Sequence, residues 1–143
     1  MRTRTSTWFE CKIRYDKMME DGMQKKITEL YVVDALSFTE AESSIIDEMS
    51  AYISGEFEVR DIKKAPYGEI FFSEDASADR FFKAKLQFIT IDEKTEKEKR
   101  SNVNYLVHAN TFNQAVANID KVMGTTAIDY VIASVAETQI MDV

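Results

Sequence analysis

Two stretches of the sequence place aromatic and cationic side chains at alternate positions, a pattern typical of surfaces that hold single-stranded nucleic acid. Alternate residues of a strand share one face, so rings there can stack on bases while lysine or arginine neutralises phosphates. Each stacked base contributes about 1–3 kcal/mol, and such binding weakens as salt is added. The nucleic-acid-binding residues predicted in this way are Trp8, Lys12, Arg14, Phe81, Lys83 and Lys85.

Two other interpretations of the apolar and charged strand faces stay open. Lysines interleaved with aromatic residues also occur on half-solvated sheet faces, or beneath another subunit. The segment from Tyr67 to Phe72 carries three large aromatic residues, Tyr67, Phe71 and Phe72. It either packs inside its own fold or forms a patch for a second copy, because exposed sheet edges invite association.

No pattern in the sequence indicates catalysis or a bound cofactor. There is no glycine-rich phosphate loop, nucleophile elbow or zinc-protease motif, and one histidine with one cysteine cannot form a usual structural zinc site. His108 lies where an internal repeat has Asp34, which favours a satisfied histidine over a general base. Cys11 is interpreted as a small buried hydrophobe. We therefore expect a non-enzymatic protein with no catalytic residue, metal or cofactor.

Composition places the chain among ordinary globular proteins. It has 143 residues, 45% of them hydrophobic, with one proline and four glycines, which excludes disordered and collagen-like classes. The 25 acidic and 18 basic side chains give a net charge of -7, which opposes non-specific binding to nucleic acid. No apolar run is long enough for a membrane span or a signal peptide. We expect a cytoplasmic protein with no membrane partner.

An internal duplication is the most informative feature of the chain. Residues 31–49 align with residues 105–123 at a constant offset of 74, and seven of these 19 positions are identical. Residues 8–15 align with residues 81–88 at an offset of 73. The two copies therefore span about 8–73 and 81–143, within a single domain of residues 1–143. The acidic segment Ser73–Asp79 is the expected connector.

Each copy predicts the same succession of strands and helix. An alternating strand leads through a hairpin, at Asp21-Gly22 in the first copy and within residues 92–97 in the second, to another strand. A helix follows, beginning at a capping box: Ser37 with Glu40, or Thr111 with Gln114. Further strands close each copy. The predicted fold is α+β, with internally duplicated ββ-α-β(β) units forming a largely antiparallel sheet with two helices.

Three segments of the chain resemble a known small family. Residues 8–15, 28–42 and 129–135 look like a domain family of unknown function found in gut Bacteroides-type bacteria and their phages. The resemblance covers nearly the whole chain and implies no catalytic residues. The duplicated order of elements is also similar to the PC4, Whirly and Pur-alpha class of single-stranded nucleic-acid binders, which implies a sheet used as a platform.

These observations lead to two functional hypotheses. The first is a single-stranded DNA-binding protein of phage or mobile-element type that uses the six residues named above. The alternative is a protein-interaction or assembly module with no nucleic-acid role, for which one expected partner is a second copy of the chain in a homo-oligomer. An enzyme comes third, since only a deep pocket around His108 or clustered carboxylates would support it.

Overall fold

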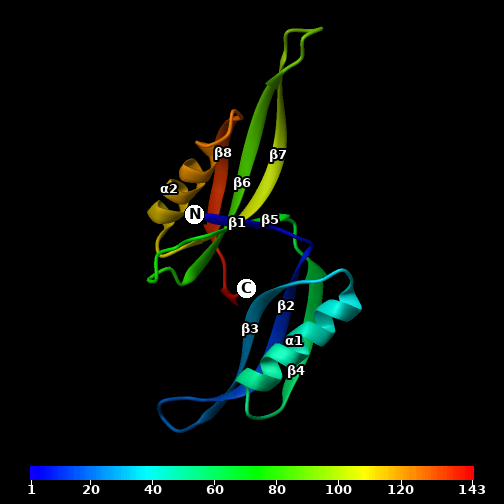
Figure 1. Cartoon of the computed structure of the whole chain (residues 1–143). Helices are drawn as coiled ribbons and strands as arrows, with labels where there is room; N and C mark the ends of the chain where they lie inside the picture. Colours follow the sequence, from blue (N-terminus) through cyan, green and yellow to red (C-terminus); the bar gives the residue numbers. More distant parts are fainter. The chain divides into compact units, whose positions relative to one another are not determined.

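The computed structural model describes all 143 residues and divides them into two compact units. Unit 1 comprises Met1–Thr5 and Pro66–Thr138, and unit 2 comprises Ser6–Ala65 and Gln139–Val143. The elements of both units, except the short last strand, are labelled in Figure 1. The chain contains two helices and nine strands in two mostly antiparallel sheets, which confirms the predicted α+β class.

Unit 2 is a four-stranded sheet covered by one helix. Along the chain it contains β2 (Trp8–Met18), β3 (Gln24–Asp34), α1 (Phe38–Tyr52), β4 (Phe57–Lys64) and β9 (Ile140–Asp142). The strand order is β4-β2-β3-β9, antiparallel except for β9, which pairs parallel to β3. Helix α1 packs against β2, β3 and β4.

Unit 1 repeats this plan with one additional strand. Its sheet order is β1-β5-β7-β6-β8, and β5 pairs parallel to β7 as β9 does to β3. Helix α2 contacts β5, β7 and β8. The additional strand is β1, which the sequence pattern did not predict. The elements are β1 (Arg2–Thr5), β5 (Glu69–Phe72), β6 (Arg80–Ile91), β7 (Glu98–Ala109), α2 (Phe112–Met123) and β8 (Asp129–Glu137).

The two units are not the two consecutive repeats. Strand β5 follows the first repeat's β4 but completes the sheet of unit 1, and β9 follows β8 but completes the sheet of unit 2. Each repeat therefore supplies a parallel strand to the other unit. The segment Ser73–Asp79, the expected connector of the repeats, is a loop of unit 1 between β5 and β6, whereas the chain crosses between units at residues 5–6, 65–66 and 138–139.

Both predicted helix starts are confirmed, although the capping boxes are incomplete. The Ser37 hydroxyl accepts from the Glu40 N–H at 3.1 Å, and the Thr111 hydroxyl accepts from the Gln114 N–H at 3.1 Å. The Glu40 carboxylate returns to the Leu36 N–H rather than to the cap residue. Side-chain acceptors thus occupy amide donors that the first turn of a helix leaves free.

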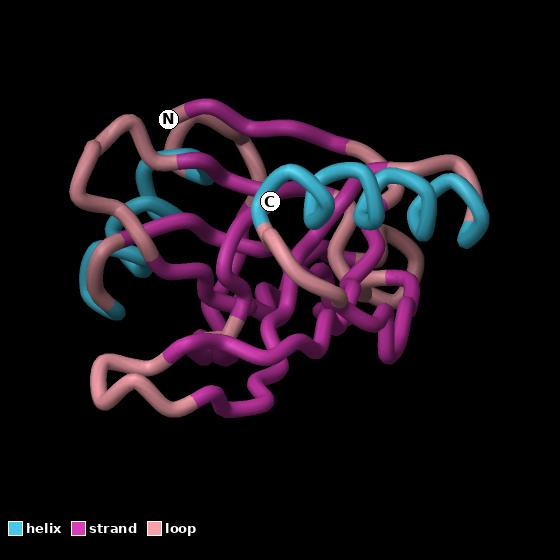
Figure 2. The backbone as a smooth tube through the Cα atoms, turned by 90° about the horizontal axis from the view of Figure 1, so that it is seen from below, coloured by secondary structure: helices cyan, strands magenta, loops and turns pink.

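Each unit has its own hydrophobic core on the helix-covered face of its sheet. Equivalent residues on the helices form a buried stripe, as their spacing predicts. Phe38 and Phe112, predicted by the same spacing to belong to it, are instead 57% and 51% exposed, because they lie in the first turn at the edge of each core. Figure 2 distinguishes these two helices from the strands and loops of the chain. The stripe residues are Ala41, Ile45 and Met49 in unit 2, and Ala115, Ile119 and Met123 in unit 1.

A bulge interrupts the same edge strand in both units. The pairing of β2 with β4 shifts between Lys12 and Ile13, which leaves Arg60 as an extra residue on β4. The pairing of β6 with β8 shifts between Lys85 and Leu86, and the extra residue is Ala133. Bulges bend and twist an edge strand, which makes it a poor template for another strand.

Candidate functional site

The predicted nucleic-acid-binding residues of unit 2 lie on the sheet face opposite the core, but their aromatic member is closed. Trp8, Lys12 and Arg14 alternate along β2 with the core residues Phe9 and Cys11. Lys12 is exposed and Arg14 is half-buried, whereas Trp8 is only 2% exposed. A base needs an open ring face to stack. Trp8 offers none in this structure.

The equivalent residues of unit 1 show the same pattern. Phe81 is 4% exposed, and its ring stacks on His108 with the ring centroids 4.8 Å apart. The Lys83 ammonium lies 5.9 Å from the centre of the Tyr67 ring, and Lys85 is exposed. The structure thus places three of the six predicted residues in each unit. It leaves Lys12 and Lys85 exposed, half-buries Arg14 and Lys83, and encloses both rings.

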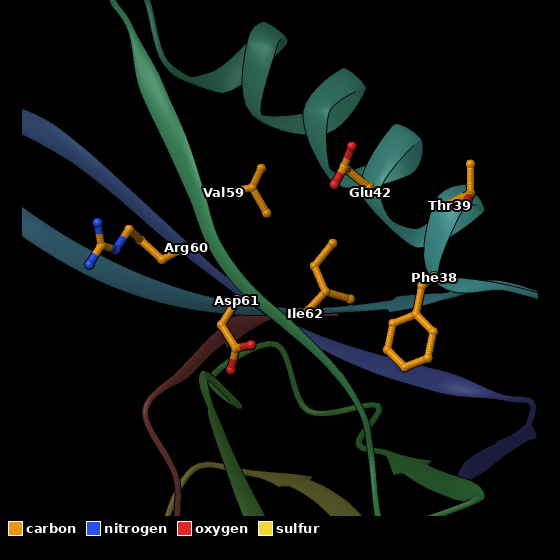
Figure 3. A pocket seen from close by; sticks show the side chains of 7 residues that line it. All are labelled: Phe38, Thr39, Glu42, Val59, Arg60, Asp61 and Ile62. Atoms are coloured by element: carbon orange, nitrogen blue, oxygen red, sulfur yellow. The ribbon is translucent and has the colours of Figure 1, made fainter.

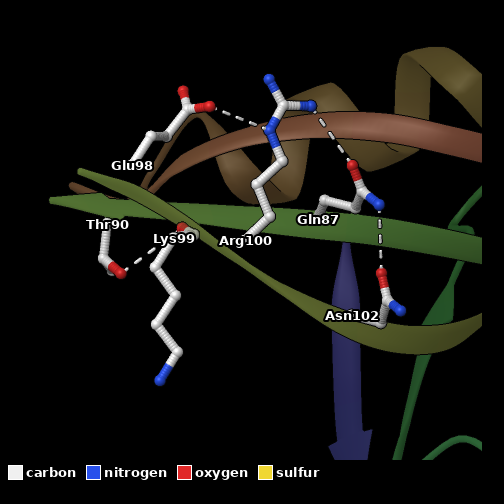
Figure 4. A network of polar contacts seen from close by, with 6 residues as sticks. All are labelled: Gln87, Thr90, Glu98, Lys99, Arg100 and Asn102. Atoms are coloured by element: carbon white, nitrogen blue, oxygen red, sulfur yellow. Dashed lines mark hydrogen bonds and ion pairs between the residues drawn. The ribbon is translucent and has the colours of Figure 1, made fainter. Parts of the chain in front are cut away.

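Farther along the same face of unit 1, polar side chains are bound to one another (Figure 4). Arg100 donates to Glu98 and to Gln87, each at 3.3 Å, and the Gln87 amide donates to Asn102 at 3.2 Å. The arginine is thus engaged by a local carboxylate and amide. This part of the β6–β7 hairpin presents a satisfied polar network rather than a row of free cations.

The two residues considered for catalysis both have ordinary structural roles. His108 Nδ1 accepts from the Ser73 N–H at 3.3 Å, and Nε2 lies 2.9 Å from the Ala78 carbonyl oxygen, so both ring nitrogens are occupied. Cys11 is fully buried, and burial together with the Glu48, Asp61 and Glu10 carboxylates raises the pKa of its thiol to about 12. A thiol that stays protonated at neutral pH is a poor nucleophile.

The aromatic residues considered for an association patch pack inside unit 1. Tyr67 and Phe71 are buried, and the Phe71 ring lies against Tyr105 with centroids 4.6 Å apart. The Arg2 guanidinium lies 4.9 Å from the centre of the Phe72 ring. Tyr67 and Phe71 are therefore closed to a second copy in this structure, and Phe72 is half-buried beside Arg2.

An apolar surface exists elsewhere, at the start of α1. A cavity of about 420 Å³ lies between α1 and the edge strand β4. Figure 3 shows Val59 and Ile62 directed toward the helix, with Arg60 and Asp61 directed away from it. Phe38 lines this cavity and is 57% exposed, while Leu36, just before the helix, is 91% exposed. We call Leu36, Phe38, Val59 and Ile62 the α1–β4 patch.

A second cavity of unit 2 lies at the other end of α1. It measures about 340 Å³, and its walls come from β3, the last turns of α1 and the chain from β9 onward. We call it the acidic pocket. Its lining residues are Tyr31, Glu48, Met49, Tyr52, Met141, Asp142 and Val143.

A buried carboxylate holds one wall of the acidic pocket in place. Glu29 is buried, and its Oε1 accepts from the Tyr15 hydroxyl at 2.9 Å and from the Tyr31 hydroxyl at 3.0 Å. Burial and the Glu29 carboxylate raise the pKa of both tyrosines, so both hydroxyls stay protonated as donors. The hydrogen bond from the Tyr31 hydroxyl to this buried oxygen holds the Tyr31 ring in place.

The sequence contains a signal for this cluster that the prediction did not use. Glu29 occupies a core-facing position of β3, between Ile27 and Tyr31 in the alternating pattern. A charged residue at such a position is rarely buried without a partner. Its partner Tyr15 is on the neighbouring strand, so strand register was needed to find it.

The structure contains neither a membrane-spanning helix nor a cluster of metal ligands. Neither helix has the length and apolar composition required to cross a bilayer. No group of three histidine, cysteine, aspartate or glutamate side chains is arranged to hold a metal ion.

Comparisons with known proteins define a family. No curated protein and no solved structure matches the chain. The family described as "Domain of unknown function (DUF4494)" matches residues 7–143, almost the entire chain, and the protein therefore belongs to that family.

Proposed function

We propose that this protein is a non-enzymatic assembly module that associates with a second copy of itself through the α1–β4 patch. The observation that carries the proposal is the exposure of Phe38, which lines a cavity of mixed apolar and charged residues, and of Leu36, two residues before it in the chain. Large apolar side chains gathered at the mouth of a cavity and rimmed by polar residues are typical of protein-interaction sites.

The rim of the patch favours a second copy as the partner. Arg60, which pairs with Glu58 at 3.2 Å, carries a positive charge, and Glu42 and Asp61 carry negative charges; all three line the cavity, although Arg60 and Asp61 point away from the helix. A contact between identical patches across a two-fold axis must be self-complementary, so both signs are needed on one rim. The bulge at Arg60 disfavours strand addition along β4, which leaves side-chain docking as the mode of contact.

The test is sedimentation velocity of the full chain over a wide concentration range. We expect reversible association that Leu36→Asn weakens at least about tenfold, as loss of a large apolar anchor does. Asparagine is the residue at the equivalent position of the other repeat, Asn110. Leu36 is almost fully exposed, so the variant should remain folded. Ile91→Asn is the matched control, because Ile91 is also exposed but belongs to unit 1.

A strictly monomeric chain at all concentrations, or equal weakening by both variants, would overturn the proposal.

The competing hypothesis, single-stranded DNA binding of phage or mobile-element type in the cytoplasm, is tested on the same sample. It is supported by the accessible cations Lys12 and Lys85. It predicts salt-sensitive binding of labelled oligothymidine that a Lys12→Glu, Lys85→Glu double variant abolishes. Such binding by a monomer would replace our proposal.

A further inference from the structure

The acidic pocket of unit 2 combines three kinds of side chain in one cavity. Tyr31 and Tyr52 contribute rings, Met49 and Met141 contribute thioethers, and Glu48 and Asp142 contribute carboxylates. Tyr31 and Met49 are buried at its base, while Tyr52 is 60% exposed and Met141 is 50% exposed. The cavity is therefore open to solvent and has an apolar floor.

The carboxylates of this pocket have no positive partner in the chain. Neither Glu48 nor Asp142 forms an ion pair with a lysine or arginine. Burial and the negative charges of Asp142 and Asp34 raise the pKa of Glu48. These charges repel one another in the free protein, and a cation placed among them would relieve that repulsion.

The end of α1 adds to the negative field. The carboxyl end of a helix carries partial negative charge, and a basic residue in the last turn usually compensates it. Helix α1 has no basic residue in its last turn, whereas α2 has Lys121 there. The pocket lies beside this uncompensated end of α1, since Glu48, Met49 and Tyr52 belong to its last turns.

The walls select the kind of cation. A small metal ion prefers several oxygen ligands, but this cavity of about 340 Å³ is also lined by aromatic rings and thioethers. Tyrosine rings attract organic cations through their faces, and methionine adapts to alkyl chains. An alkylammonium group satisfies both features, because its charge meets the carboxylates and its chain meets Met49 and Met141.

We propose that the acidic pocket is a binding site for an alkylammonium group, either of a free polyamine or of a lysine side chain on another protein. The site is independent of the assembly proposed above, since it lies at the opposite end of α1 and shares no residue with the α1–β4 patch. Glu48 and Asp142 neutralise the ammonium, and the Tyr52 ring covers it at the mouth.

The test is NMR of the full chain with ¹³C-labelled methionine methyl groups, titrated at low salt with spermidine and separately with N-acetyl-lysine amide. We expect Met49 and Met141 to shift together and to saturate. Met123 is the internal control, because it occupies the position of Met49 on the other helix. Saturation with spermidine alone assigns a free polyamine, and saturation with the lysine amide assigns a side chain of a partner.

Two variants separate the pocket from the general charge of the protein. Glu48→Gln should weaken binding about tenfold, since it removes one charge partner of the ammonium. Asp47→Asn changes the residue of α1 that precedes Glu48. It should leave the affinity unchanged because Asp47 does not line the pocket. The proposal fails if neither amine produces saturation or if uncharged octanediol produces the same shifts. Equal weakening by the two variants would also overturn it.

Discussion

The two units differ in how the core is filled beside their parallel strands, β5 in unit 1 and β9 in unit 2. In unit 1 the parallel strand β5 delivers Phe71, which is 1% exposed and packs on Tyr105. In unit 2 the parallel strand β9 is only three residues long, and Tyr31, the repeat equivalent of Tyr105, lines a cavity. Unit 1 therefore has a filled core at this place, whereas unit 2 has the acidic pocket, which is open to solvent.

The substitutions between the copies are concentrated around this place. Glu29 in unit 2 corresponds to Val103, Tyr15 to Phe88, and Glu48 to Val122 in unit 1. Elsewhere on the helices the buried apolar residues are identical in both copies, and Asn118 of α2 is the one buried polar residue, with Ser44 as its counterpart in α1. Burial of a carboxylate lowers the stability of a fold. Unit 2 therefore has polar residues at positions where unit 1 has apolar residues that would give a more stable core.

The largest expected difference between the units comes from truncating their parallel strands. Phe71→Ala should destabilise unit 1 by about 3–5 kcal/mol, because it empties a packed aromatic site. Met141→Ala should cost less than about 1 kcal/mol, because Met141 is half-exposed beside a cavity. Urea unfolding followed by circular dichroism measures both. Similar costs for the two variants would show that β9 is packed as tightly as β5.

The next effect concerns the buried carboxylate of unit 2. Glu29→Val copies the residue of unit 1 but leaves the Tyr15 and Tyr31 hydroxyls without their acceptor, at a cost of about 1–3 kcal/mol. Adding Tyr15→Phe and Tyr31→Phe to this variant should restore most of the stability, since no polar group is then stranded. The same urea series measures both variants. A triple variant no more stable than Glu29→Val would contradict the role assigned to the hydroxyls.

A third variant makes unit 2 resemble unit 1. Met141→Phe places a ring beside Tyr31 and should stabilise the protein by about 1 kcal/mol, through apolar area removed from water. Thermal unfolding measures the gain. The same variant should block the spermidine titration, because the ring occupies the cavity. Retained binding would place the ammonium outside the acidic pocket.

The smallest effect is a pH dependence at Glu48. A raised pKa in the folded state means that the folded protein holds this proton more tightly, so stability decreases as pH rises through the unfolded value of 4.5 and the higher folded value. Glu48→Gln should therefore stabilise the protein at pH 7 by less than about 1 kcal/mol, since the side chain is largely exposed. The gain should vanish below pH 4. Urea midpoints measured across this range would expose an opposite trend.

Local chemistry made the helix starts and the first hairpin predictable. Ser37 and Thr111 accept from amides three residues ahead, and Gly22 has a φ of 81°, as its turn requires. These features depend only on residues close in the chain. The offset of 74 then transferred each prediction from one copy to the other.

Features that depend on distant partners were not predictable in this way. Nothing within the four residues of β5 or the three of β9 indicates which sheet they join, because a short apolar strand fits either edge. Alternation correctly placed Trp8 and Phe81 on the face opposite the core, but it cannot show whether that face is covered. The rings therefore proved buried while Lys12 and Lys85 remained exposed.

The crossing of β5 and β9 between units also constrains how such a chain can change over generations. A recombination event that removed one repeat would leave the other without its parallel strand, exposing the edge of β3 or β7. We therefore expect the two copies to be inherited together, since neither would fold with a complete sheet if it were transferred alone into another gene. In such a linked pair, the first copy can accumulate charged residues such as Glu29 and Glu48, while the second copy keeps apolar residues at the equivalent positions.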